Sequence, residues 1–252
     1  MGNRQGLDQV QADKYRTAGY TIIAIDYRLA PQAKLPQIIE DLEDAHRWVR
    51  TVGPKLFRID PNRVAVVGPS AGGYLALMAG FVLAPPPKAV VSFYGYGDIT
   101  AAWYSRPDPF HNRRPSVSKE EAYRAVGTRV IAEDPGMNRW PFYLYTRQQG
   151  RWPMELVGHD PDREPRAFDR FCPLRNVTKD YPPTLLLHGD NDTDIPFAQS
   201  VLMATELERH GIQHELISMP GRGHGFDRAM GDPVIAATFD RVLTFLGRSL
   251  KP

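Results

Sequence analysis

The sequence predicts an α/β fold, with a mostly parallel sheet and helices on both faces. Short apolar, β-branched runs alternate along the chain with segments of helical periodicity, and such runs are typical of strands buried on both faces. Strands that alternate with helices are joined by right-handed crossovers, which makes the sheet parallel. The chain has 252 residues, of which 42% are hydrophobic and 24% charged, a composition that suits one α/β domain with an ordinary core.

Five strands and four helices are expected in alternation. The helix expected at 197–210 ends before Gly211, since glycine adopts a left-handed C-terminal conformation most easily. Asp232-Pro233 begins the helix expected at 232–250. Active sites of parallel sheets lie at the carboxyl ends of the strands. The expected strands are 20–27, 63–68, 89–94, 183–188 and 213–219, and the expected helices are 36–49, 71–82, 197–210 and 232–250.

The alternation stops for more than 80 residues between Gly97 and Pro183. A segment of that length is usually functional or has structure of its own. We therefore expect one domain over 1–252, with residues 98–180 inserted as a cap or lid that shapes a substrate pocket. The alternative is a surface insertion that only packs on the core.

Composition excludes several classes of protein. The net charge is +2, so nothing favours binding to nucleic acid or to an anionic membrane. The apolar stretches are too short for a membrane span, and no signal sequence begins the chain. A single cysteine, Cys172, forms no internal disulfide, which permits a reducing compartment, and we expect a cytoplasmic location. The sequence leaves a homodimer open.

Gly68-Pro69-Ser70-Ala71-Gly72 matches the G-x-S-x-G pattern, and it lies between an expected strand and an expected helix. In that context the serine occupies a sharp, strained turn that exposes its hydroxyl, and small neighbours avoid clashes. Ser70 is therefore the expected nucleophile. The backbone N–H of Ala71 is the expected oxyanion donor.

A nucleophilic serine needs a base that is itself held by a carboxylate, and in this fold the order along the chain is Ser, acid, His. Asp192 follows the expected strand 183–188, and His224 follows the strand 213–219. Asp190 and Asp194 compete with Asp192 for the role of acid. His188, at a strand end, is expected to form local hydrogen bonds.

No metal site is expected. The D-x-D-x-D spacing around Asp192 lacks the glycine and the glutamate of a calcium loop, because Ile195 and Val201 occupy those positions. No Cys/His cluster has the spacing of a zinc site either.

Several motifs together resemble the hormone-sensitive-lipase-like esterases and the bacterial acetyl-xylan and feruloyl esterases of the α/β-hydrolase superfamily. The resemblance covers roughly residues 15–95 and 180–230. The residues that match the family pattern are Asp26-Tyr27-Arg28-Leu29-Ala30-Pro31, Pro36, Asp41, Trp48, Asp60-Pro61-Asn62-Arg63 and Gly68-x-Ser70-Ala71-Gly72-Gly73.

The resemblance implies a triad of Ser70, His224 and Asp192. The family's H-G-x-x-D pattern selects Asp192 over its neighbours, and a G-H-G or G-H-x-F setting selects His224. The resemblance also implies that no cofactor is needed and that short acyl esters are the substrates.

Two features depart from the family. Pro69 stands where the lipase-like members usually carry Asp. The H-G-G-G oxyanion loop and the strand leading into it fall ahead of residue 1, so we expect a truncated form of a longer hydrolase. The family places that strand between 20–27 and 63–68, and these two strands would either lose a neighbour or pair with each other.

The expected function is hydrolysis of short-chain carboxylic esters through an acyl-enzyme. Trp103, Tyr104 and Phe226 are candidates for substrate contact. One alternative is a serine peptidase of the prolyl-oligopeptidase type, although no propeller-like sequence is present. The other is a catalytically impaired hydrolase or binding protein that lacks part of the oxyanion site.

Overall fold

The computed structural model describes residues 2–134, 136 and 138–251. These residues divide into two compact units, a helical unit and a sheet unit. The helical unit comprises the N-terminal residues through Gly6, 24–42 and 99–172, and the sheet unit comprises 7–23, 43–98 and the residues from Pro173 onward.

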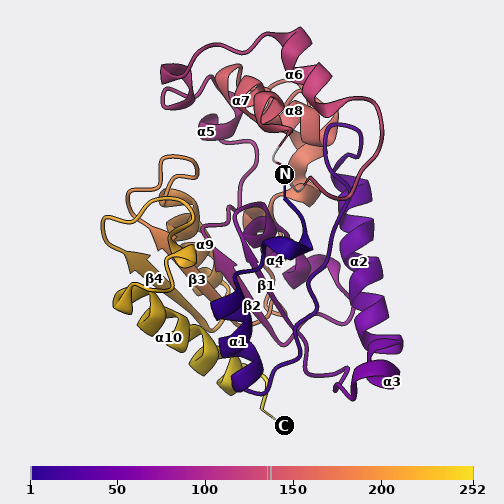
Figure 1. Cartoon of the computed structure of the whole chain (residues 1–252), viewed down its shortest axis with the longest axis vertical. Coiled ribbons are helices and arrows are strands. Elements are labelled where there is room, and N and C mark those ends of the chain that lie inside the picture. The colour runs from indigo at the N-terminus through magenta and orange to yellow at the C-terminus, as the bar shows by residue number, and fades with distance from the viewer. Residues whose placement is uncertain (1, 135, 137, 252) are drawn as a thin grey trace. The chain divides into compact units, whose positions relative to one another are not determined.

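The sheet unit contains a four-stranded sheet in which every pair of neighbouring strands is parallel (Figure 1). The strand order β1-β2-β3-β4 follows the chain, and Val67 is opposite Val91 in the register. This confirms the predicted α/β class and four of the five predicted strands. The strands are β1 (Ala65–Pro69), β2 (Ala89–Phe93), β3 (Thr184–Gly189) and β4 (His214–Met219).

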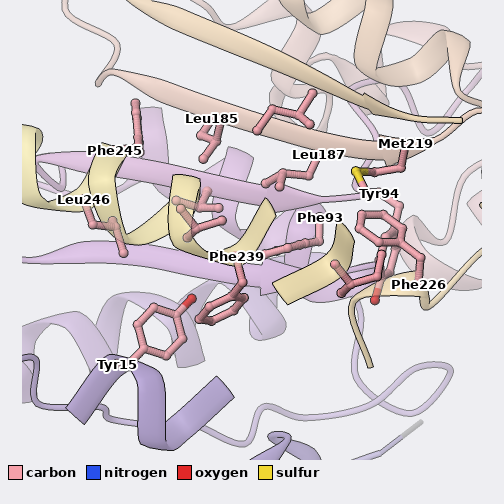
Figure 2. Close-up of a cluster of buried hydrophobic side chains, with 14 of the residues drawn as sticks. Tyr15, Phe93, Tyr94, Leu185, Leu187, Met219, Phe226, Phe239, Phe245 and Leu246 are labelled. Carbon is pink, nitrogen blue, oxygen red and sulfur yellow. The ribbon is translucent and has the colours of Figure 1, made fainter. Parts of the chain in front are cut away.

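Helices cover both faces of this sheet, as predicted. On one face α4 (Ala71–Val82) and α9 (Ala198–Arg209) pack on alternate side chains of the strands, such as Val90 and Leu186. On the other face α1 (Gln9–Thr17) and α10 (Pro233–Ser249) pack on the intervening ones (Figure 2). This second cluster includes Tyr15, Val91, Phe93, Leu185, Leu187, Ile217, Phe239, Val242 and Leu246.

The prediction of a strand at 20–27 is wrong: residues 20–29 form neither strand nor helix. A strand needs a hydrogen-bonding neighbour, and in the described part of the chain β1 pairs with β2 alone, so β1 ends the sheet. We expected either that the strands lose a neighbour or that they pair with each other. The structure shows the first outcome, because among the described residues β1 has no strand on its other side. The apolar character of the segment has another cause, because Tyr20 and Ile22 pack against the cluster beneath α10.

The remaining helices are short apart from α2 (Leu35–Thr51), which begins in the helical unit. Arg28, in the segment Asp26–Pro31 that resembles the esterase family, binds Asp41 on α2. Its Nε lies 2.9 Å from both carboxylate oxygens of Asp41. The other elements are α3 (Gly53–Phe57), α5 (Ala102–Ser105), α6 (Lys119–Val126), α7 (Trp140–Gln148) and α8 (Trp152–Val157), with 3-10 turns at Arg4–Gly6, His111–Arg113, Pro165–Phe171, Pro173–Arg175 and Phe226–Arg228.

Residues 99–172 thus have structure of their own, with a small core around Ala122, Val126 and Phe142. The role of this segment as a cap stays a prediction. A helix with the length and apolar character needed to cross a membrane is absent from the described residues.

Candidate active site

Ser70 occupies a sharp turn between β1 and α4. Its backbone dihedrals are φ 55° and ψ −120°, a conformation that costs a non-glycine residue about 1–3 kcal/mol. The Ser70 N–H donates to Phe93 O at 2.9 Å, which holds the turn against β2. A Cβ at Gly68 would lie 2.2 Å from the carbonyl oxygen of Gly72, so the turn requires glycine there. The crowding predicted at Gly72 is milder, with Pro69 Cδ at 3.3 Å.

The loops that follow β3 and β4 are hydrogen-bonded to each other. Asn191 N–H donates to Arg222 O at 3.0 Å, and Gly221 N–H donates to Asp190 Oδ1 at 2.6 Å. The loops approach so closely that a Cβ at Gly189 would lie 2.1 Å from Arg222 O. This contact explains the glycine of the H-G-x-x-D pattern. It also sets the distance between the side chains that the two loops carry.

Ser70, His224 and Asp192 form one hydrogen-bonded series. His224 Nε2 lies 3.0 Å from Ser70 Oγ, and His224 Nδ1 lies 2.8 Å from Asp192 Oδ2. The structure thus brings together the three residues selected from the sequence. Of the two competing carboxylates, Asp190 binds the Gly221 N–H, while Asp194 Oδ2 lies 3.6 Å from His224 Nε2.

Asp192 is held as a carboxylate by several donors. Its Oδ1 accepts from the N–H groups of Asp194 at 2.8 Å and Ile195 at 2.9 Å. Buried His188 lies 3.4 Å from its Oδ2, and also contacts Ser200 Oγ and Ile195 O, the local role predicted for it. Burial alone would raise the pKa of Asp192, but the hydrogen bonds from His188 and His224 hold that pKa well below its usual range.

The His224 imidazole is surrounded by negative charge. Burial disfavours its charged form, but the hydrogen bond to Asp192 and the charges of Asp194, Asp192 and Asp227 raise its pKa above the usual histidine value. A histidine with this set of neighbours is suited to gain a proton during a reaction.

The other predicted site residues lie at the start of α4, in the core of the sheet unit and in the helical unit. Ala71 is the first residue of α4, and N–H groups in the first turn of a helix lack partners within it. Phe226 is 7% exposed and packs in the core beside Phe93 and Tyr94. Trp103 and Tyr104 belong to the helical unit, where their rings stack on each other. Substrate contact by all three aromatic residues stays a prediction.

Two residues near His224 were missed from the sequence. The Tyr94 ring lies 4.6 Å from the imidazole, centroid to centroid, and the Tyr94 hydroxyl donates to Asp227. Tyr94 falls just after β2, at the edge where a site is expected, and this position was the available signal. Nothing in the sequence pattern pairs it with Asp227.

Most of the chain is similar in sequence to known proteins. The family model BD-FAE matches residues 2–207. Esterase LipC from Mycobacterium tuberculosis is 30% identical over 223 residues, which cover 83% of this chain and 46% of LipC. The chain spans less than half the length of the curated relatives it matches.

Solved structures share the fold over nearly the whole chain. A Staphylococcus aureus protein of unknown function has a TM-score of 0.75 at 21% identity, covering 100% of this chain and 86% of that one. An acetyl ester-xyloside bifunctional hydrolase from Caldicellulosiruptor lactoaceticus has a TM-score of 0.69 at 22% identity, covering 96% and 76%. At these identities the likeness establishes the fold alone.

Proposed function

Because the chain belongs to the BD-FAE family of α/β-hydrolases, we propose that it hydrolyses short-chain carboxylic esters with Ser70 as the nucleophile. The observation that carries the proposal is the hydrogen-bonded series from Ser70 Oγ through His224 to Asp192. A serine hydroxyl is a weak nucleophile until an adjacent base takes its proton. The similarity to a protein described as an esterase supports the class of substrate.

The reaction has two acyl-transfer steps. Ser70 Oγ attacks the ester carbonyl carbon while its proton passes to His224 Nε2, and Asp192 stabilises the resulting imidazolium. The Ala71 N–H, at the positive end of α4, donates to the oxyanion. The bond to the alcohol oxygen then breaks as His224 returns the proton to it. Water attacks the acyl-enzyme by the same route, which releases the carboxylic acid and restores Ser70.

Hydrolysis of p-nitrophenyl esters by the full chain tests this function. We expect turnover of the acetate and butyrate, a lower rate with the octanoate, and a loss of about 10⁴-fold or more in Ser70→Ala. Equal rates for the folded wild-type chain and Ser70→Ala would contradict the proposal and favour a non-catalytic role. The matching butyryl p-nitroanilide tests the peptidase alternative, which predicts that the amide is cleaved at a rate comparable with the ester.

A further inference from the structure

Tyr94 and Asp227 lie beside His224 but outside the series that ends at Asp192. Tyr94 directly follows β2, and its ring is inclined at 58° to the imidazole at a centroid distance of 4.6 Å. Asp227 is three residues beyond His224, in the 3-10 turn Phe226–Arg228. Figure 2 shows the Tyr94 ring next to Phe226 at one end of the apolar cluster. Two separate segments therefore contribute to one polar pair within the core.

Asp227 is a buried carboxylate held by uncharged donors. It is 6% exposed, and its Oδ1 accepts from the Tyr94 hydroxyl. Gln11 Nε2, from α1, donates to Asp227 Oδ2 at 3.0 Å and to the Asp227 carbonyl oxygen at 2.8 Å. These bonds satisfy the carboxylate without neutralising its charge. In a poorly solvated site such a charge acts strongly on nearby titratable groups.

The backbone of Tyr94 is strained to place its ring there. Its φ is 37°, a left-handed conformation that costs a bulky residue about 1–3 kcal/mol. The Tyr94 N–H donates to Leu187 O on β3 at 2.6 Å, which fixes the residue against the sheet. Strain of this kind persists only where the surroundings enforce it, and it is concentrated at functional sites.

We propose that Asp227, acting through Tyr94, is a positioning residue that holds the aromatic ring against His224 and favours the imidazolium formed when His224 takes the Ser70 proton. The inference rests on the proposed esterase function. An aromatic ring attracts a cation near it, and a phenol that donates to a carboxylate is richer in electrons than a free one. The stabilisation is therefore greater after proton transfer than before it, as a contribution to catalysis must be.

Other charged groups also act on His224, and the test must separate them. Asp192 binds Nδ1 and Asp194 lies 3.6 Å from Nε2, so both favour the imidazolium directly. The charge of Asp227 also raises the pKa of His224. Burial and Asp227 raise the pKa of the Tyr94 hydroxyl, whereas the charge of Arg228 lowers it. Asp227→Asn removes the Asp227 charge while its amide oxygen can still accept from Tyr94, although its NH₂ then faces Gln11 Nε2 where Asp227 Oδ2 accepted. Asp240→Asn, at an exposed position of α10 where Asp240 pairs with Lys14, is the matched control.

The primary measurement is the pKa of His224 by NMR titration of the histidine side chains, assigned by the signal lost in His224→Gln. In Asp227→Asn we expect this pKa to fall by about half a unit to one unit. We also expect kcat for p-nitrophenyl butyrate to fall about tenfold, with KM unchanged. Asp240→Asn should leave all three values unchanged. Because the NMR titration needs no turnover, it tests the contact even if the chain proves not to be an esterase.

Tyr94→Phe provides a second variant, and it decides the question if Asp227→Asn does not fold. It keeps the ring but removes the hydroxyl, so we expect a smaller fall in the His224 pKa in the same direction. The double variant should shift the pKa no further than Asp227→Asn alone, because both changes break one path. A His224 pKa and kcat that stay at wild-type values, with only the melting temperature lowered, would show a structural role and overturn the proposal.

Discussion

The helical unit and the sheet unit both bury charged side chains, but they compensate these charges differently. In the helical unit Arg147 is 1% exposed and donates to Asp108 Oδ2 at 2.5 Å. Its guanidinium also lies 5.3 Å and 5.2 Å from the ring centroids of Trp103 and Tyr104. In the sheet unit, by contrast, the carboxylates Asp192, Asp194 and Asp227 gather around one histidine, His224.

The difference separates an arrangement suited to stability from one suited to proton transfer. Arg147 keeps its charge at every accessible pH, so a fixed anion and fixed aromatic faces are suited only to holding it in place. His224 changes its charge near neutral pH, and surrounding carboxylates lower the free energy of its protonated form. Breaking the first arrangement should therefore reduce stability, and breaking the second should reduce the rate.

Asp192→Asn should have the largest effect on rate. The amide oxygen can keep the backbone hydrogen bonds of Asp194 and Ile195, but an amide NH₂ facing His224 Nδ1 stabilises the wrong tautomer. We expect kcat/KM for p-nitrophenyl butyrate to fall about 10⁴-fold. Asp190→Asn, in the same loop, is the control and should cost less than about tenfold. Similar losses in both variants would contradict the assignment of Asp192.

Arg147→Met should have the largest effect on stability. It removes the guanidinium that donates to the buried Asp108 carboxylate, and removal of one member of a buried pair costs about 3–5 kcal/mol. Urea unfolding of the full chain measures this loss. Arg106→Met is the matched control: Arg106 pairs with Asp162 on the surface, so its loss should cost less than about 1 kcal/mol. Equal losses would show that burial of the Arg147 pair is unimportant.

The fold of the sheet unit was predictable because each element carries its own signal. The helix 71–82 was predicted from its Gly/Ala-rich apolar run, and α4 has the same bounds. The segment 20–27 was not predictable in the same way. Its apolar pattern is compatible both with a paired strand and with packing of Tyr20 and Ile22 on the core, and only the neighbours in space decide between them.

The site was predictable only where sequence motifs mark it. Ser70, Asp192 and His224 each sit in a short pattern with glycine neighbours, and at Gly68 and Gly189 the close approach of turns and loops requires the glycine. Tyr94 and Asp227 have no such pattern, since their contact joins positions 133 residues apart. The contact between Arg147 and Asp108 could not be predicted either, because no local sequence pattern links a helix to a loop 39 residues away.

Gly68→Ala tests the turn that links the sheet to Ser70, the proposed nucleophile. The new Cβ would lie 2.2 Å from Gly72 O, so Ser70 or the start of α4 must move. A displacement of about 1 Å at a reacting group costs about 100-fold in rate, and we expect kcat/KM to fall by that order. Gly72→Ala, whose Cβ would meet Pro69 Cδ at 3.3 Å, should lose less than about tenfold. Reversed effects would mean that the turn differs from the one described.

The smallest expected effect is on the pH dependence of kcat/KM. It tests most directly whether the carboxylates around His224 favour its protonated form. His224 accepts a proton only when neutral, so kcat/KM should rise with pH through its pKa, with a midpoint above the usual histidine value of 6.5 because that pKa is raised. The pKa of Asp192 is lowered, so its titration should leave this limb undisturbed. Asp194→Asn should move the midpoint down by less than about one unit. A wild-type midpoint at or below 6.5 would contradict this account of His224.

The same shift affects stability in the opposite direction. A pKa raised by folding contributes stability that is fully present below the unfolded value and is lost as pH rises through the folded value. The contribution of His224 to the free energy of unfolding should therefore decrease over the pH range in which kcat/KM increases. Comparing urea unfolding of the wild type with that of His224→Gln across this range isolates the contribution.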